Sequence, residues 1–464
     1  MDITKKAIDW QSFSGNFESR FSRFFKQFNI ATHAHDAYIR KTKGTTAISI
    51  FKKLFLLPFI KSNIYRNIVI NCSSDIKKDA IYDFLRSCKF NWRRFLIKLS
   101  YSVYKYFDNL TDRNRESVFI IDDSTLERNR SKKVELLARI YDHTQSMFVR
   151  GFKMLTLAWS DGASLIPIDF ILHSSSNPKH RYHESTKKID KRTSGAIRRK
   201  EALTKTTELV VPVIQRALAA GFRAKYLLMD SWFAMPCLIT KVSKYINTIC
   251  MLKRTSKVTY IFEGKNLNVM QIYSQLRKRR GLAKILASAI VSFKNGPQAK
   301  IVFIRNRNVK SDWLAIITTD INQSEEDVVR IYGKRWDIEV FFRTAKQHLE
   351  LERGFQGRDY DSLVAHTTIV MTRYIFLSVE QRRATDQRTL GLLFHACCEE
   401  ATDYTFATAL CQIAYMVEDN LKRYPGNQIK DNGAVLRAFS DAFRSCGLNI
   451  DTIFNDYGRL AMVC

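Results

Sequence analysis

The spacing of apolar residues changes twice along this chain. Over residues 1–110, apolar side chains recur three or four positions apart, most clearly at 10–30 and 76–99, with lysines and arginines between them. This spacing predicts amphipathic helices. From about residue 360 to the end the pattern again predicts helices.

Between these regions, short apolar runs rich in β-branched residues predict strands. The runs are 118–121, 154–160, 165–172, 226–229, 248–252, 285–293, 300–304 and 313–319. Asp161 and Gly162 suit a hairpin turn between the second and third runs. One helix is expected to end at Gly221, and a long one to span about 324–351. This order predicts an α/β fold in which helices cover a mixed sheet.

Charge points to the class of partner. The chain has 464 residues, enough for two or three domains, and carries 75 Lys and Arg against 45 Asp and Glu, a net charge of +30. Such an excess predicts a polyanionic partner, because neutralised phosphates release their counterions. The basic, aromatic segment 90–95 suits DNA binding, although a solvated amphipathic helix explains the same pattern.

Membrane and zinc-binding classes have little support in the sequence. No apolar run approaches the roughly 18–20 residues that span a bilayer, and the N-terminus leads into no apolar signal core. We therefore expect a soluble, intracellular protein without a membrane partner. The nine cysteines form no CxxC pair, which predicts reduced thiols and leaves oxygen ligands for any metal.

Three acidic residues occupy positions suited to metal chemistry. Asp123 and Asp230 end predicted buried strands, where side chains project into the crevice of an open α/β sheet. Glu339 lies on the helix predicted after the last strand. If the strands are neighbours, the three carboxylates converge, and we expect them to hold Mg²⁺ or Mn²⁺. Two ions about 3.5–4 Å apart would activate a water and stabilise the leaving oxygen of a phosphodiester.

The segment around Glu339 carries a polar stripe. On one continuous helix, Tyr332, Arg335, Glu339 and Lys346 fall within a sector of about 60°. Apolar residues border this stripe, as in the wall of a cleft. Arg335 and Lys346 could then grip phosphates beside the metals, and Tyr332 could donate to a phosphate oxygen. Taken alone, Arg335 and Glu339 are also an ordinary helix pair.

These motifs resemble the insertion-sequence-four family of DDE transposases. The resemblance rests on Tyr-x2-Arg-x3-Glu-x6-Lys at 332–346, on Asp123-Ser124-Thr125, and on the segment 228–233 around Asp230. It implies a ribonuclease-H-like catalytic core with a β-rich insertion at about 236–310, and Asp123, Asp230 and Glu339 as metal ligands. Asp122 and Asp123 are adjacent and point to opposite faces of a strand. We choose Asp123 because Ser-Thr follows it directly.

The resemblance also gives Trp313 a role. In well-studied members of the family, a tryptophan that opens the strand before the glutamate helix stacks on a flipped base, and Trp313 occupies that place. A tryptophan at the start of a strand is also commonly a packing residue. Both interpretations stay open at this point.

We divide the chain into three regions: a basic, helical, DNA-binding region at 1–112, the ribonuclease-H-like domain at 113–357, and a helical C-terminal region at 358–464, a candidate for dimerisation. The expected function is cut-and-paste transposition of an insertion sequence. It would cleave double-stranded DNA at terminal inverted repeats and transfer the strand into target DNA, as a homodimer assembled on DNA at the nucleoid of a bacterial or archaeal cell. The alternatives are a ribonuclease-H-like nuclease without strand transfer and a non-catalytic DNA-binding protein derived from a transposase.

Overall fold

The computed structural model describes residues 20–64, 76–112, 115–185, 189–281, 283–294, 296–309, 311–383 and 388–402. Two compact units are distinguishable. Unit 1 comprises the described parts of Met1–Ser87, Gln347–Gly357 and Asp361–Cys464, and unit 2 comprises those of Cys88–Lys346 and Arg358–Tyr360.

Unit 1 is helical. Its elements are α2 (Arg20–Gln27), α3 (Ile30–Asp36), α4 (Ala47–Leu56), α5 (Lys78–Leu85) and nearly all of α13 (Tyr360–Arg383). Its core is aromatic: Phe376 of α13 lies 5.0 Å from Phe21 and 5.8 Å from Phe55, measured between ring centroids. The helix predicted over 10–30 is confirmed only for α2, because Asn29 adopts a left-handed conformation that ends it before α3 begins. Residues 10–19 lie outside the described part.

Helix α13 corrects the expectation that no segment is long and apolar enough to cross a membrane. Among the described helices it alone meets that test by length and composition, and its apolar stretch is fully buried within the protein. A core helix has the same properties, because burial on all sides also selects apolar residues. The arginine at position 373 fits this setting. Its guanidinium donates to the backbone carbonyls of Leu54, Phe55 and Leu349.

Unit 2 is built on a mixed sheet. In the described residues its strands are β1 (Val118–Glu127), β2 (Ala138–Asp142), β3 (Met147–Ser160), β4 (Leu165–His173), β5 (Tyr226–Met229), β6 (Asn247–Met251), β7 (Thr259–Phe262), β8 (Lys265–Asn268), β9 (Ile285–Ser292), β10 (Gln298–Arg305) and β11 (Trp313–Thr318). They form one sheet in the order β2-β3-β1-β5-β6-β11-β10-β9-β7-β8, with β4 also paired to β3. All eight strands expected from the sequence are present.

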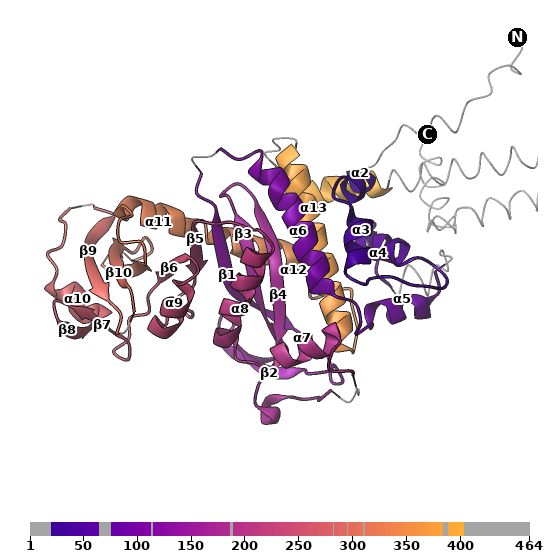
Figure 1. Cartoon of the computed structure of the whole chain (residues 1–464), viewed down its shortest axis with the longest axis horizontal. Helices are drawn as coiled ribbons and strands as arrows, with labels where there is room; N and C mark the ends of the chain where they lie inside the picture. Colours follow the sequence, from indigo (N-terminus) through magenta and orange to yellow (C-terminus); the bar gives the residue numbers. More distant parts are fainter. Residues whose placement is uncertain are drawn as a thin grey trace, which may run out of the picture. The chain divides into compact units, whose positions relative to one another are not determined.

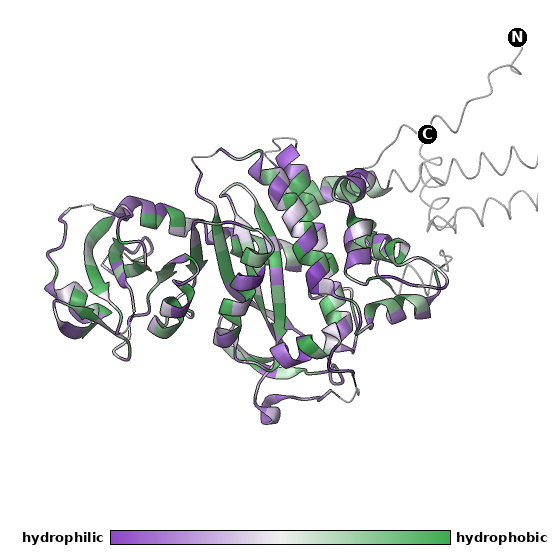
Figure 2. Ribbon diagram, in the orientation of Figure 1, coloured by the Kyte–Doolittle hydropathy of each residue, from purple (hydrophilic) through white to green (hydrophobic). Residues whose placement is uncertain are grey.

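The topology has an antiparallel part and a parallel part. β1 pairs antiparallel with β3, and β3 with β4, whereas β1, β5 and β6 run parallel. This mixed α/β core confirms the predicted fold class. The apolar strands of this core form its green interior in Figure 2. The turn at Asp161 and Gly162 is also confirmed: Gly162 has φ +83°, and the Asp161 carboxylate accepts from the backbone N–H of Ser164.

Helices complete unit 2. They are α6 (Trp92–Asp108), the short 3₁₀ turn η2 (Pro178–His180), α7 (Ser194–Ala202), α8 (Thr206–Ala219), α9 (Pro236–Val242), α10 (Val269–Gln275), α11 (Glu325–Gly333) and α12 (Trp336–Gln347). Helices α6, α7 and α8 pack on β4 (Figure 1). Helix α6 thus belongs with the sheet, although the sequence placed it in the N-terminal helical region.

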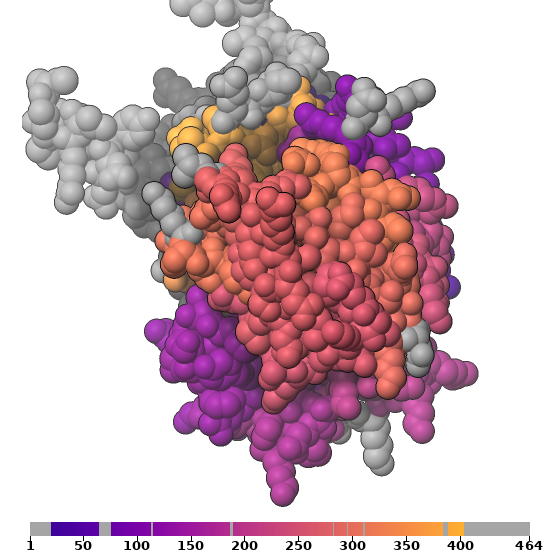
Figure 3. Space-filling view, turned by 90° about the vertical axis from the view of Figure 1, so that its left-hand side faces the viewer, coloured from indigo at the N-terminus to yellow at the C-terminus, as the bar shows by residue number. Residues whose placement is uncertain are grey.

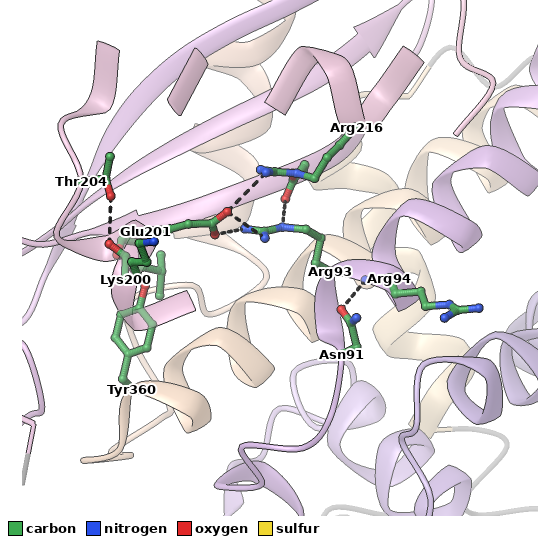
Figure 4. Close-up of polar contacts among 10 residues, drawn as sticks. Asn91, Arg93, Arg94, Lys200, Glu201, Thr204, Arg216 and Tyr360 are labelled. Atoms are coloured by element: carbon green, nitrogen blue, oxygen red, sulfur yellow. Dashed lines mark hydrogen bonds and ion pairs between the residues drawn. The ribbon is translucent and has the colours of Figure 1, made fainter. Parts of the chain in front are cut away.

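An ion-pair network joins these helices to the sheet. Asp169 of β4 is almost fully buried and accepts from Arg93 of α6 and from Arg216 of α8. Both arginines also pair with Glu201 of α7 (Figure 4). Two cations and two anions balance each other, so the burial of these charges is compensated.

The strands β7 to β10, together with α10, form a β-rich insert that precedes β11. The surface of this insert, in the coral part of the colour scale, faces the viewer in Figure 3. The inserted residues extend the sheet beyond β11, because β10 pairs with β11 and β9 with β10. The sequence missed β7 and β8 of this insert, each of four residues, and β2 outside it.

Candidate active site

Two adjacent aspartates lie on β1 just after its buried residues Val118–Ile121. Asp122 is directly opposite Thr156 and Asp123 opposite Leu155 in the pairing with β3, so their side chains point to opposite faces of the sheet. The two faces have different coverings, and this decides what each carboxylate can meet.

Asp123 lies on the face that α6 and α8 cover. Leu155, its partner on β3, lies on the same face as Leu157, and Leu157 is directly opposite Asp169 of β4. Asp169 forms the ion pairs with α6 and α8, so these helices cover the face of Asp123. The Asp123 carboxylate accepts from the Lys153 ammonium at 3.3 Å. The sequence-based choice of Asp123 as metal ligand stays a prediction, but the structure pairs this carboxylate with a lysine.

Asp122 lies on the other face, where α12 is found. Its carboxylate is 3.2 Å from the Arg335 guanidinium and accepts at 2.8 Å from the backbone N–H of Asp123. Burial raises the pKa of Asp122 to about 7. Arg335 opposes this shift, whereas the negative charges of Asp123 and Asp230 add to it. Asp122 is therefore within electrostatic reach of the second predicted acid.

Asp230 follows the fully buried strand β5 directly. β5 runs parallel to β1 with Met229 opposite Ile121, so Asp230 and Asp122 are the next residues on neighbouring strands. Side chains at matching positions of parallel strands point to the same face. Asp230 also belongs to the environment of Tyr332, whose hydroxyl donates to the Met229 carbonyl at 3.5 Å: burial raises the pKa of Tyr332, and the Asp230 charge adds to that rise.

Glu339 is on α12, and the helix predicted over 324–351 is in fact two helices. α11 ends at Gly333 and α12 begins at Trp336. The backbone N–H groups of Lys334 and Arg335 reach carbonyls three residues back, as in a tight 3₁₀ turn. The prediction of one continuous helix was wrong at this point, since Gly333 has low helix propensity and lets the turn tighten.

The kink does not separate the polar residues. Arg335 lies in the turn and its guanidinium donates to Glu339 at 2.6 Å as well as to Asp122. One cation thus bridges a carboxylate of β1 and a carboxylate of α12. With Asp230 beside Asp122, three acids from β1, β5 and α12 gather on one face of the sheet. Within the described part of the chain, no three or more His, Cys, Asp or Glu side chains are placed to hold a metal ion together.

The other residues of the predicted stripe are placed differently. Tyr332 is buried, so its ring is mostly inside the protein. The Lys346 ammonium donates to the Thr125 carbonyl of β1 at 2.6 Å, which anchors the end of α12 beside the acids. Trp313 is stacked on Tyr273 with ring centroids 4.4 Å apart, and the Arg254 guanidinium lies 5.3 Å from its centroid. These contacts support the packing interpretation of Trp313, and base stacking stays a prediction.

The comparison with protein families fits this geometry. A family model described as DDE superfamily endonuclease matches residues 64–288. The match contains β1 and β5 with Asp122, Asp123 and Asp230, and it ends before Trp313, Arg335 and Glu339. It supports a nuclease-type function that acts on DNA. No curated protein matches the chain.

Asp122 is a candidate site residue that the sequence interpretation did not choose. The signal was present: Asp122 follows the apolar run 118–121 directly, just as Asp230 follows 226–229. Because β1 and β5 are adjacent and parallel, residues at the same position after their apolar runs lie side by side in the sheet. Pairing the two runs would have favoured Asp122 over Asp123.

Proposed function

We propose that this protein is a DDE transposase whose acids are Asp122, Asp230 and Glu339. The main support for this proposal is that the Arg335 guanidinium joins Asp122 of β1 to Glu339 of α12, while Asp230 lies beside Asp122. Carboxylates that already surround the Arg335 guanidinium form a negatively charged environment that could hold a metal cation instead. The family match to residues 64–288 supports the two aspartates independently of Glu339.

The donor chemistry fits a hard divalent ion. Carboxylate oxygens are the ligands that Mg²⁺ and Mn²⁺ prefer, and burial of Asp122 beside another aspartate disfavours an uncompensated negative charge. Asp122, Asp230 and Glu339 would hold the metal, and a pair of ions supplies an activated water and stabilisation of the leaving oxygen. Asp123 would keep its ion pair with Lys153 and would not bind a metal ion.

Arg335 would then move from the acids to the substrate. With Asp122 and Glu339 holding a metal, its guanidinium would be free to make bidentate hydrogen bonds with a DNA phosphate. Lys346 is proposed to add a point charge beside the same phosphate, and Tyr332 to support the strand end at Met229. These residues bind and orient the phosphodiester, and the acids position the groups that react.

The reaction we propose has two phosphoryl-transfer steps at one site. Hydrolysis at a transposon end breaks the bond between phosphorus and the 3′ oxygen and frees a 3′-hydroxyl. That hydroxyl then attacks a target phosphodiester, forming a new bond as the target strand's own 3′ oxygen leaves. We further propose terminal inverted repeats as the substrate and a homodimer on DNA inside a bacterial or archaeal cell, as the resemblance implies.

A plasmid that carries the gene with its native flanking DNA tests this proposal. With Mg²⁺ the wild-type chain should cut at the ends of the element, and EDTA should stop the reaction. Glu339→Gln should reduce cleavage by at least about 100-fold, because a direct metal ligand matters more than an outer-shell partner, whose loss costs about 10–100-fold. The matched control is Glu326→Gln, an exposed acid on α11 that should cleave like the wild type.

Precut ends separate the proposal from its two alternatives. A transposase should join a precut end with a free 3′-hydroxyl to target DNA. A nuclease would cut without producing joined molecules. A non-catalytic DNA-binding protein would bind the ends without Mg²⁺-dependent cleavage, and Glu339→Gln would then change nothing.

A further inference from the structure

The hairpin formed by β2 and β3 carries aromatic and arginine side chains on its exposed face. In β2 the burial alternates, with Ala138 and Ile140 inside and Arg139 and Tyr141 outside. The buried side forms its own apolar cluster with Val149. The outer side chains are therefore not needed for the core of the hairpin.

These outer residues form a patch by cross-strand pairing, which we call the hairpin patch. Arg139 lies directly opposite Arg150, and Tyr141 opposite Phe148. The Arg139 guanidinium lies 4.1 Å from the Phe148 ring centroid, and that of Arg150 lies 4.8 Å from the ring of Tyr182. The three rings are far from buried: the exposed fractions are 38% for Tyr141, 54% for Phe148 and 47% for Tyr182.

The charge of the hairpin patch is uncompensated. Two arginines directly opposite each other repel and destabilise the hairpin. Neither guanidinium forms an ion pair with a carboxylate of the described residues. The loop between β1 and β2 adds three exposed basic residues, Arg130, Lys132 and Lys133. Two arginines that repel each other and lie beside exposed aromatic rings indicate a ligand that is anionic and carries aromatic groups.

The hairpin patch lies on the same face of the sheet as Asp122. Asp122 is opposite Thr156 in β3, and Arg150 and Phe148 follow at even spacing along the same strand. No irregularity interrupts this part of the pairing, so alternation keeps their side chains on one face. β1 continues for five residues beyond Asp122 to Glu127, roughly 17 Å of strand, before the hairpin pairing takes over.

We infer that the hairpin patch binds single-stranded DNA that leaves the acidic site. This inference rests on the proposed function, since cleavage creates strand ends that can separate from their partner. Arginine attracts the phosphates, and exposed rings stack on unpaired bases of any sequence. A duplex would use the arginines alone, because its bases are already stacked. A second copy of the chain is disfavoured as occupant, since it would bring Arg139 and Arg150 against the same two cations.

Fluorescence anisotropy with the full-length chain in EDTA tests this without catalysis. The probes are a labelled oligothymidylate of about 20 nucleotides, long enough for one site, and a blunt duplex of matched length. Tyr141→Ala with Phe148→Ala should weaken single-strand binding by at least about 30-fold, as expected for two lost stacking contacts. Duplex binding should change less than about twofold, because phosphates dominate it.

Two further variants make the result interpretable. Phe148→Tyr should retain single-strand binding, because a ring remains. Tyr245→Ala removes an equally exposed tyrosine elsewhere in unit 2 and should leave both probes unaffected. Equal losses on the two probes, unchanged single-strand binding, or a change in oligomeric state by light scattering would each overturn the inference. Because no metal is present, failure here is distinguishable from failure of the proposed cleavage.

Discussion

At the scale of single residues, Asp122 and Asp123 show how one position along a strand changes the chemistry available to a carboxylate. Asp122 is paired with Arg335 on the face of the three acids, whereas Asp123 is paired with Lys153 on the face that α6 and α8 cover. The backbone between them is continuous strand. The difference therefore comes from alternation alone.

This contrast gives a direct prediction. Asp122→Asn should lower Mg²⁺-dependent cleavage at least about 100-fold, because a neutral amide is a poor ligand for a hard cation. Asp123→Asn, its matched control, should cleave within about tenfold of wild type, at the lower end of the 10–100-fold cost of an outer-shell change, because its side chain lies on the opposite face of the sheet. The rates would be measured on the same plasmid substrate. If the Asp123 variant is the inactive one, the sequence-based choice is right and our assignment is wrong.

What the sequence could supply at this scale was the type of residue and its strand, not the face. Asp230 and Glu339 stay predicted site residues; the sequence pointed to each without ambiguity, since each stands alone after a strand or within a polar stripe. Asp122 and Asp123 could be separated only by the pairing of β1 with β5. The equal positions of Asp122 and Asp230 after their apolar runs decide between the two aspartates only once β1 and β5 are known to be neighbours, and that pairing depends on contacts between segments about a hundred residues apart.

At the scale of elements, the network of Arg93, Asp169, Glu201 and Arg216 holds α6, α7 and α8 to β4. A largely buried network of this kind is sensitive to the loss of one partner, because the charges that remain are poorly solvated. The sheet face that these helices cover is the one opposite Asp122. The network thus holds the helices on the face of the sheet that is opposite to the candidate site.

Replacement of Arg93 should show this sensitivity. Arg93→Met leaves two buried carboxylates with one arginine and should lower the free energy of unfolding by about 3–5 kcal/mol. Arg94→Met is the matched control: this neighbouring side chain is exposed and points away from the network in Figure 4, so its loss should cost within about 0.5 kcal/mol. Urea unfolding followed by circular dichroism measures both. Equal effects of the two substitutions would contradict the role given to the network.

Elements were predictable where the apolar pattern was long or continuous. The eight strand runs appear as strands, and the fold class follows from their order. β2 was missed because its five residues include charged side chains that interrupt the apolar pattern. β7 and β8 were missed because each has four residues, and their tight connection at Glu263 and Gly264 depends on left-handed backbone conformations. The break between α11 and α12 was missed because one glycine in a helical pattern is usually tolerated.

At the scale of the whole molecule, the net charge of +30 is the property that the sequence states most directly. Some of the 75 Lys and Arg side chains are paired locally: Arg93, Arg216 and Arg335 all bind carboxylates in the structure. Other cations, such as those of the hairpin patch, have no such partner among the described residues. Cations without a carboxylate partner are the ones that can bind DNA phosphates.

Binding to duplex DNA should therefore depend steeply on salt. If the chain neutralises 6–10 phosphates, affinity measured without Mg²⁺ should fall about 10³- to 10⁵-fold between about 50 and 200 mM salt, because each contact releases condensed counterions. Fluorescence anisotropy titrations at several salt concentrations give the slope. A peptide nucleic acid duplex of the same sequence, which lacks phosphates, serves as the control and should bind weakly at every salt concentration. A shallow slope, with log affinity falling by less than about two per log unit of salt, would correspond to only about two phosphates. The excess charge would then serve something other than the DNA backbone, and the proposed function would lose its electrostatic support.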